Sequence, residues 1–294
     1  MRKKRGFTLV ELLVVIAIIA LLMGILMPAL ARVRQIAFRM VCGSNLSGIG
    51  KAMLIYAGDY EDELPRAGGR NTTWGGAGCV VWNALTRQLA YGLDATGNGG
   101  RASISSCFYL LVKYSEVTPK SFICKGDSGT AEFKLSGELN PGNMEFIDCW
   151  DFGSEPLKHC SYTYHLPFGL YALTTSSEPG MAVAADRSPW IDSPAATAKT
   201  IAQFNPTGTV DQQKFGSSIS HQEDGQNVLF MDGHVYFEKR SFCAINDDNI
   251  YTYWDGGDIR RGGAPQLASV PGDRKDSFLV HDGAGTGGVV PPRR

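Results

Sequence analysis

One carboxylate stands inside an apolar stretch near the start of the chain. Residues 3–11 read Lys-Lys-Arg-Gly-Phe-Thr-Leu-Val-Glu, and an uncharged run follows from there to Leu30. A carboxylate at bilayer depth costs about 2.5–3.5 kcal/mol on insertion scales, so Glu11 needs a cationic partner. Cleavage after Gly6 would create one, because the new amino group on Phe7 would lie one helical turn from Glu11. The same cation could also reach Glu11 of a neighbouring subunit.

The hexapeptide Gly6-Phe7-Thr8-Leu9-Val10-Glu11 resembles the processing site of type IV prepilins and type II secretion pseudopilins. The resemblance extends to Leu30 and includes a proline within the apolar helix, here Pro28. It implies that a prepilin peptidase in the membrane cleaves between Gly6 and Phe7 and methylates the new N-terminus. It also implies a structural subunit that assembles through its N-terminal helix, with copies of itself or other pilin-like subunits, into a pilus or secretion pseudopilus. Glu11 and Pro28 are then the expected assembly residues.

Length and charge fit one membrane helix followed by one exported domain. The chain has 294 residues and a net charge of −1, and loss of the basic residues at positions 2–5 makes it more acidic. This balance argues against nucleic acid or anionic lipid headgroups as the main partner of the domain. Residues 7–30 would form a helix about 36 Å long, enough to span a bilayer. The positive-inside rule predicts a single-pass protein with a cytoplasmic N-terminus and the domain outside the cytoplasm. The resemblance implies that the membrane is the inner membrane, with a periplasmic or otherwise extracytoplasmic domain, or that the protein forms a cell-surface filament.

Other interpretations of the N-terminal segment stay open. It could be an ordinary signal anchor, or a secretory signal cut near Pro28-Ala29-Leu30-Ala31. A tethered domain that never polymerises could instead bind a ligand, such as a carbohydrate, through tryptophan-rich loops. The tryptophans concerned are Trp74, Trp82, Trp150 and Trp254. A tether has no need of Glu11, which favours the assembling subunit.

We expect an α+β fold of the type IV pilin kind, in which a long N-terminal α-helix packs on an antiparallel β-sheet domain. Beyond Pro28, apolar residues recur at helical spacing and form one face, which we call the apolar stripe. Its members are Phe38, Cys42, Leu46, Ile49, Met53, Tyr56 and Tyr60. Glycines at 43, 48 and 50 predict bending or local melting of this helix.

The expected organisation follows from these segments. It comprises a cleaved leader (1–6), a transmembrane and assembly helix (7–30), an amphipathic helix (31–62), an exported domain (63–282) with a β-hairpin at 226–238, and a disordered tail (283–294).

The hairpin is predicted by two β-rich runs that flank Asp232-Gly233, a pair typical of type I′ turns. His221 with Asp232 and Gly233 resembles the C-terminal signature of a prepilin-like subfamily, which has nine residues between the histidine and the aspartate. Here ten residues intervene, and we place the extra one in the loop 222–225, which leaves the role of His221 open. Other segments that resemble this subfamily are Asn45-Leu46, Phe122-Ile123-Cys124, Ala185-Asp186-Arg187 and Asp276-Ser277-Phe278-Leu279.

Catalysis is not expected, because the chain has no Gly-x-Ser-x-Gly, His-Glu-x-x-His, P-loop or dinucleotide glycine pattern. Calcium is the one cofactor with candidate ligands. The aspartates at 247, 248, 255 and 258 place several hard oxygens within a dozen residues, although not at EF-hand spacing.

Seven cysteines allow up to three disulfides in an exported domain. Cys149 and Cys160 are a plausible pair, whereas Cys42 on the apolar stripe is expected to be unpaired. The lack of a Cys-x-x-Cys motif argues against zinc and against a thioredoxin-like centre. We expect a short strand at 120–124, which includes Cys124.

Overall fold

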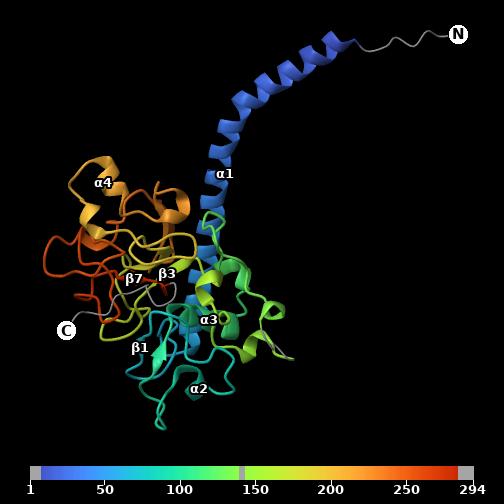
Figure 1. Ribbon diagram of the computed structural model, residues 1–294. Coiled ribbons are helices and arrows are strands. Elements are labelled where there is room, and N and C mark those ends of the chain that lie inside the picture. The colour runs from blue at the N-terminus through green and yellow to red at the C-terminus, as the bar shows by residue number, and fades with distance from the viewer. Residues whose placement is uncertain (1–7, 139–142, 284–294) are drawn as a thin grey trace.

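The computed structural model of the chain describes residues 8–138 and 143–283 (Figure 1). The expected leader (1–6), the residue Phe7 and the tail from 284 onwards lie outside the described residues. The architecture is mixed α and β: a long N-terminal helix, α1 (Leu9–Asp59), is followed by a domain built on a five-stranded antiparallel sheet. This is the fold class that the sequence predicts, and it matches a pilin-like architecture.

Helix α1 has two halves with different surroundings. Its N-terminal half extends away from the domain, and its C-terminal half runs along the domain (Figure 1). Five members of the apolar stripe are buried, namely Cys42, Leu46, Ile49, Met53 and Tyr56, which confirms the predicted face. Phe38 is half-buried and Tyr60 is exposed at the two ends of that face. The helix ends before residue 62, because Glu61 and Asp62 both adopt left-handed φ angles.

The glycines of α1 do not melt it, so the prediction of local melting is wrong. The helix is unbroken through Gly43, Gly48 and Gly50. Gly50 lies against strand β5 (Gln226–Phe230), where a Cβ would come within 2.8 Å of Leu229 Cδ1. A Cβ on Gly43 would come within 3.0 Å of Asn227 Oδ1 on the same strand. Two of the three glycines therefore permit the close approach of helix and sheet.

The sheet has the strand order β6-β5-β4-β3-β7, and every neighbouring pair is antiparallel. The strands other than β5 are β3 (Tyr162–His165), β4 (Ala182–Asp186), β6 (Val235–Glu238) and β7 (Leu279–Val280). Every residue of β3, β4 and β5 is buried, whereas β6 at the edge is partly exposed.

Both faces of this sheet are covered, which explains why β4 and β5 lack the alternation of a half-exposed strand. One face packs with α1 and with α3 (Ile104–Tyr114), and residues such as Leu229 and Tyr164 belong to that core. The opposite face packs against long loops through a second cluster. Its buried members are Ala182, Ala185, Trp190, Phe204, Val228, Phe230, Phe242, Ile250, Tyr251 and Leu279.

Short elements complete the domain. They are α2 (Arg87–Tyr91), α4 (Val210–Lys214), a parallel pair of two-residue strands β1 (Thr73–Trp74) and β2 (Arg101–Ala102), and several 3-10 turns. The strand expected at 120–124 is wrong, because this segment contains the 3-10 helix η1 (Pro119–Phe122). Pro119 at its first position favours a helical turn and cannot donate to a strand ladder.

The hairpin of β5 and β6 has a different turn from the one expected. Type I′ requires a positive φ at both central residues, yet only Gly233 (φ 85°) is left-handed. Gly233 N donates to Phe230 O (2.9 Å), and Phe230 N donates to His234 O (3.0 Å). This is a three-residue loop in which a tight turn is followed by a left-handed glycine, and Asp232 occupies an ordinary conformation.

Candidate functional site

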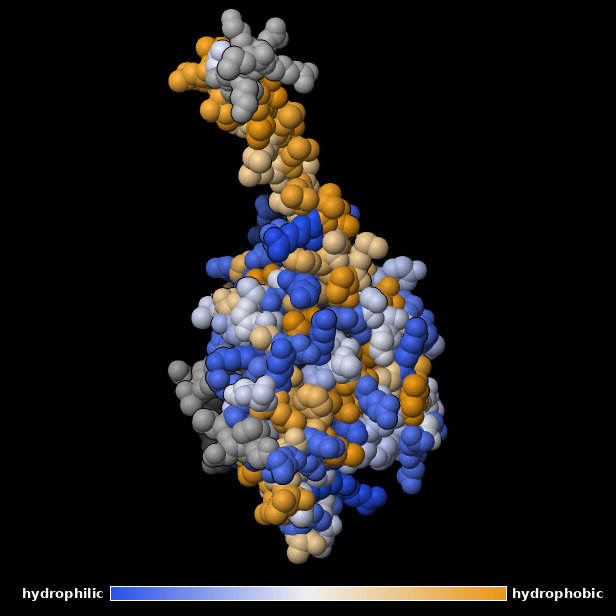
Figure 2. Space-filling model, turned by 90° about the vertical axis from the view of Figure 1, so that its right-hand side faces the viewer, coloured by the Kyte–Doolittle hydropathy of each residue, from blue (hydrophilic) through white to orange (hydrophobic). Residues whose placement is uncertain are grey.

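The N-terminal half of α1 is the largest uncovered apolar surface of the described chain. Every residue from Thr8 to Arg34 is exposed, and Figure 2 shows this half as a hydrophobic rod above a more hydrophilic domain. Among the described residues, α1 is the one helix whose length and composition would allow it to cross a membrane. An apolar surface of this size is not stable in water, so it requires lipid or other helices around it.

Glu11 caps the start of this helix. Its Oε2 accepts hydrogen bonds from Thr8 N (2.8 Å) and Thr8 Oγ1 (2.7 Å), and Glu11 N donates to Thr8 Oγ1 (3.3 Å). These bonds form a capping box, which satisfies backbone donors that the helix itself leaves free. The carboxylate is thus held at the positive end of the helix dipole, next to the position where a mature N-terminus would lie.

The other expected processing and assembly residues are only partly visible. Gly6 and Phe7 lie outside the described residues. Pro28 lies inside α1 without ending it, within the exposed half. A proline there removes one backbone donor and favours a bend, and Figure 1 shows that α1 is curved.

His221 does not lie on the hairpin surface with Asp232 and Gly233. It is fully buried at the end of the 3-10 helix η6 (Ile219–His221), where its Nε2 lies 3.2 Å from Asp186 Oδ2. The same nitrogen lies 3.3 Å from Asn227 Nδ2 and 3.6 Å from Cys124 Sγ. Asp232, by contrast, is exposed and pairs with His234 beside the turn.

The loop between His221 and β5 is where the sequence predicts the extra residue, and that placement stays a prediction. Gln222 and Glu223 adopt left-handed φ angles of 59° and 61°, which non-glycine residues rarely do. Asp224 in this loop pairs with Arg39 of α1 (2.5 Å), whose guanidinium also lies over the Phe237 ring. The ion pair therefore attaches the loop before the hairpin to α1.

The cysteine pairing differs from the one expected. Cys42 forms a disulfide with Cys124, with a Cα–Cα distance of 5.2 Å, whereas Cys149 and Cys160 are unpaired in the described structure. The apolar stripe buries Cys42 directly against the segment after η1, so its burial promotes pairing rather than preventing it. No local pattern indicates this bond, because its two residues are 82 positions apart.

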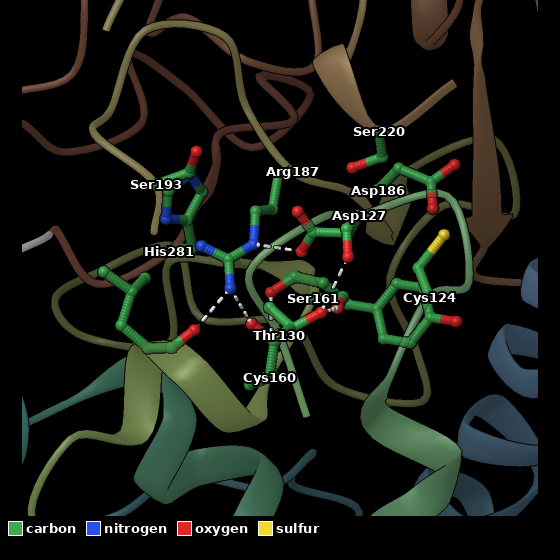
Figure 3. A network of polar contacts seen from close by, with 12 residues as sticks. Cys124, Asp127, Thr130, Cys160, Ser161, Asp186, Arg187, Ser193, Ser220 and His281 are labelled. Atoms are coloured by element: carbon green, nitrogen blue, oxygen red, sulfur yellow. Dashed lines mark hydrogen bonds and ion pairs between the residues drawn. The ribbon is translucent and has the colours of Figure 1, made fainter. Parts of the chain in front are cut away.

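A buried ion pair lies next to this disulfide (Figure 3). Arg187 Nε and Asp127 Oδ2 are 2.7 Å apart, and both side chains are almost fully buried. Arg187 also donates to the backbone oxygens of Leu157 and Cys160. Burial raises the pKa of Asp127, while the adjacent guanidinium acts in the opposite direction. The pair ties the loop after Cys124 to the end of β4.

The four calcium candidates are not gathered into one site. Asp248 is buried and its Oδ2 accepts from Ser277 N (2.6 Å), whereas Asp247 and Asp255 are exposed. Asp258 is also exposed and forms an ion pair with Arg260 (2.9 Å). Within residues 8–138 and 143–283, these aspartates do not form a group of three ligand atoms close enough to share an ion. Calcium binding stays a prediction.

The four tryptophans of the binding alternative are largely occupied within the domain. Trp74 is buried and the other three are half-buried. The indole nitrogens of Trp74, Trp150 and Trp254 donate to Asp282, Ala84 and Gly257 respectively. These contacts leave little of the indoles free for a ligand.

Comparison with known proteins assigns the N-terminal segment. Residues 1–27 match the model of the prokaryotic N-terminal methylation motif, while no curated protein and no solved structure matches the chain. Together with the apolar helix and the sheet domain, this motif is consistent with a type IV pilin-like protein. The motif implies processing by a prepilin peptidase and a pilin-like assembly, and the helix supports a single-pass membrane anchor.

Sequence reasoning missed the grouping of Cys42, Cys124, Asp186 and His221. A signal was present, because Cys124, Asp186 and His221 all lie in segments that resemble the prepilin-like subfamily. The structure brings these segments to one place, where Asn45 of α1 also donates to Ile123 O (3.1 Å).

Proposed function

We propose that this protein is a structural pilin-like or pseudopilin-like subunit, cleaved between Gly6 and Phe7 and methylated on Phe7. The observation that supports this most directly is the exposed N-terminal half of α1. From Thr8 to Ala31 it contains one ionisable residue, Glu11, at the end nearest the processing motif. A plain anchor gains nothing from that carboxylate, whereas an assembling helix gains a specific partner for it.

In the assembled form, apolar helices pack together in a central bundle. Apolar helix surfaces alone would let neighbouring subunits slide along the filament axis. A charged contact is therefore needed to fix the axial position of each subunit. We assign this contact to Glu11 of one subunit and the Phe7 ammonium of its neighbour. In the single subunit Glu11 bonds to Thr8, next to Phe7, so its carboxylate already lies at the right end of the helix.

The segments of the chain have separate roles in this proposal. Residues 1–6 are a cytoplasmic leader, residues 7–30 cross the inner membrane and later assemble, and residues 31–62 fasten this helix to the domain. The domain at 63–282 lies outside the cytoplasm and has a structural rather than catalytic role. Arg32, Arg34 and Arg39 lie between the apolar half of α1 and the domain.

The test is the intact mass and N-terminal sequence of the protein from membranes of its host, for the natural chain and for Gly6→Val. We expect a natural chain that begins at N-methyl-Phe7. The branched side chain of Gly6→Val should block cleavage, because it occupies space where the peptidase needs bare backbone. Gly24→Val is the matched control, since a Cβ at Gly24 meets no atom within 4 Å in the described structure.

Either of two results would contradict the proposal. A natural chain cut near Ala31 would indicate a secreted domain. A chain that retains Met1 would indicate a simple tether, and the search would move to ligands of the domain.

A further inference from the structure

Four side chains that can bind a metal converge in the core, where α1 meets the sheet. Cys42 comes from α1, Cys124 follows η1, Asp186 ends β4 and His221 ends η6. Each is at most 1% exposed. One ligand atom from each lies within 4.8 Å of the other three, and we call these residues the Cys–His–Asp cluster. Figure 3 shows the Cys124 sulfur directed toward Asp186.

The distances within the cluster fit a tetrahedral zinc site. Ligand bonds of zinc to sulfur, nitrogen and oxygen place neighbouring sulfur and nitrogen about 3.6 Å apart, and nitrogen and oxygen about 3.4 Å apart. Cys124 Sγ lies 3.6 Å from His221 Nε2. His221 Nε2 lies 3.2 Å from Asp186 Oδ2. The sulfur–nitrogen edge of the tetrahedron is therefore already close to the required length, and the Asp186 carboxylate lies beside the imidazole.

Two polar atoms of the cluster have no hydrogen-bond partner in the described structure. Asp186 Oδ1 and His221 Nδ1 are buried and have no hydrogen-bond partner among residues 8–138 and 143–283. His221 Nε2 faces both the acceptor Asp186 Oδ2 and the donor Asn227 Nδ2, at 3.2 and 3.3 Å. If Nε2 carries a proton, its N–H faces the N–H donor of the Asn227 amide. If Nε2 carries none, its lone pair faces the carboxylate oxygen of Asp186. Neither tautomer therefore suits both neighbours. A cation on Nε2 removes the conflict with the carboxylate.

Asn227 holds the carboxylate in this position. Its backbone N and its Nδ2 both donate to Asp186 Oδ2, at 2.7 and 3.0 Å, which leaves Oδ1 free to bind an ion. Gly126 allows the loop to lie against the imidazole, because a Cβ there would come within 2.8 Å of His221 Nδ1. Such supporting contacts orient ligands at metal sites.

We propose that the reduced chain binds one zinc ion through Cys42 Sγ, Cys124 Sγ, His221 Nε2 and the Asp186 carboxylate. Two thiolates, one imidazole and one carboxylate form a donor set suited to zinc. The disulfide between Cys42 and Cys124 is the oxidised alternative at the same place. Either state joins α1 to the core of the domain, so the connection survives a change of redox conditions.

The two states interconvert by ordinary thiol–disulfide exchange. A dithiol gives two electrons and two protons to the disulfide, yielding two cysteine thiols and the disulfide of the dithiol. Zinc then displaces the two thiol protons to solvent and takes both thiolates as ligands. Oxidation of the thiolates by a disulfide releases the ion. The sequence rule based on Cys-x-x-Cys misses this site, because each ligand comes from a different element.

The test uses the full chain in detergent, reduced with a phosphine, loaded with zinc and dialysed. We expect one equivalent of zinc on the reduced chain and none on the oxidised chain, measured by elemental mass spectrometry. Cobalt in place of zinc should give a sulfur-to-metal charge-transfer band. Asp186→Asn keeps the shape of the side chain and an acceptor for Asn227, and it should weaken zinc binding at least about tenfold. Cys42→Ser should do the same.

Matched controls lie outside the cluster. Cys243→Ser removes a cysteine that is unpaired in the described structure, and His234→Ala removes a half-buried histidine, so both should bind zinc as the natural chain does. Near-ultraviolet circular dichroism shows which variants fold. If Cys42→Ser does not fold, zinc binding by Asp186→Asn alone tests the proposal. A folded, reduced natural chain without zinc would overturn the proposal. Equal zinc binding by Asp186→Asn and the natural chain would also overturn it.

Discussion

Gly50 lies where α1 and β5 come closest, and its missing side chain is part of the contact. An added Cβ would lie 2.8 Å from Leu229 Cδ1, so the buried Leu229 side chain would have to shift against its core neighbours. Gly50→Ala should therefore destabilise the protein by about 1–3 kcal/mol, the usual cost of overpacking. Urea unfolding of the full chain in detergent, followed by tryptophan fluorescence, measures the effect.

Gly48→Ala is the matched control for this prediction. It lies in the same helix, and a Cβ there meets no atom within 4 Å in the described structure. Alanine is a better helix former by about 0.8–1.0 kcal/mol, so this variant should be slightly more stable. If both variants were more stable than the natural chain, helix propensity rather than packing would determine the effect of a side chain at residue 50.

The buried pair of Arg187 and Asp127 gives a second prediction at the residue scale. Arg187→Met keeps the bulk of the side chain but leaves a buried carboxylate without its cation, which typically costs about 3–5 kcal/mol. Arg260→Met removes the cation of the exposed pair with Asp258 and should cost less than about 1 kcal/mol. Thermal unfolding of both variants checks the difference. Similar small losses of stability in the two variants would mean that the buried ion pair of Arg187 with Asp127 contributes little to stability.

At the scale of elements, the start of α3 is held between two buried carboxylates. Asp282 accepts from Ile104 N (3.0 Å) and Ser105 N (2.8 Å) in the first turn of the helix. Asp151 accepts from Ser103 Oγ (2.5 Å), the side chain that caps the same helix. Burial, with a smaller contribution from Asp282, raises the pKa of Asp151 to about 7.

This raised pKa predicts a loss of stability as pH rises. The folded state binds the Asp151 proton more tightly than the unfolded state, whose pKa is near 3.8. The contribution is complete below that value and is lost up to about pH 7, at about 1.4 kcal/mol per pH unit. Asp151→Asn should lack this term, so the stability of the natural chain relative to the variant should fall from pH 4 to pH 7.

The comparison with Asp151→Asn is needed because other buried groups also titrate. Burial lowers the pKa values of His165 and His281 to about 4 and 3, which gives stability the opposite pH slope. Urea unfolding midpoints at several pH values isolate the contribution of Asp151 to stability. Glu132→Gln, which changes an exposed carboxylate, is the control. A difference between Asp151→Asn and the natural chain that does not vary with pH would contradict it.

The elements that could be predicted from the sequence are those with local signals. The apolar stripe from Cys42 to Tyr56 follows from helical spacing, because each step depends on residues three or four apart. The burial of β5 on both faces depends on distant loops, whose residues are not marked by a local pattern. The Cys–His–Asp cluster could not be predicted from the sequence for the same reason, because its four ligands come from four different elements. The turn at Gly233 shows a subtler failure, because Asp-Gly also fits a three-residue loop.

At the scale of the whole molecule, the chain combines an apolar rod with a polar domain, and α1 is their common element (Figures 1 and 2). In the proposed assembly, any force on the domain would pass through α1. The disulfide at Cys42, the ion pair of Arg39 with Asp224 and the close contact at Gly50 all fasten this helix to the sheet region. The exposed half beyond them is left free to meet lipid or neighbouring subunits.

Assembly itself is predicted to depend on the charge of Glu11. Glu11→Ala should be cleaved like the natural chain, because the change lies beyond the bond between Gly6 and Phe7. It should form no filaments, since the Phe7 ammonium of a neighbouring subunit would enter the apolar bundle without a partner, at a cost of several kcal/mol. Shearing of cells, followed by electron microscopy and N-terminal sequencing of the membrane fraction, measures assembly and processing separately.

Glu11→Gln distinguishes the charge from the helix cap. A glutamine can still accept the hydrogen bond that Thr8 N donates to the side chain of residue 11, so the start of α1 stays capped. It cannot neutralise an ammonium group. If charge sets the register, Glu11→Gln should fail to assemble just as Glu11→Ala does, although both are processed. Normal filaments from Glu11→Gln alone would assign Glu11 to capping, and normal filaments from both variants would remove it from assembly altogether.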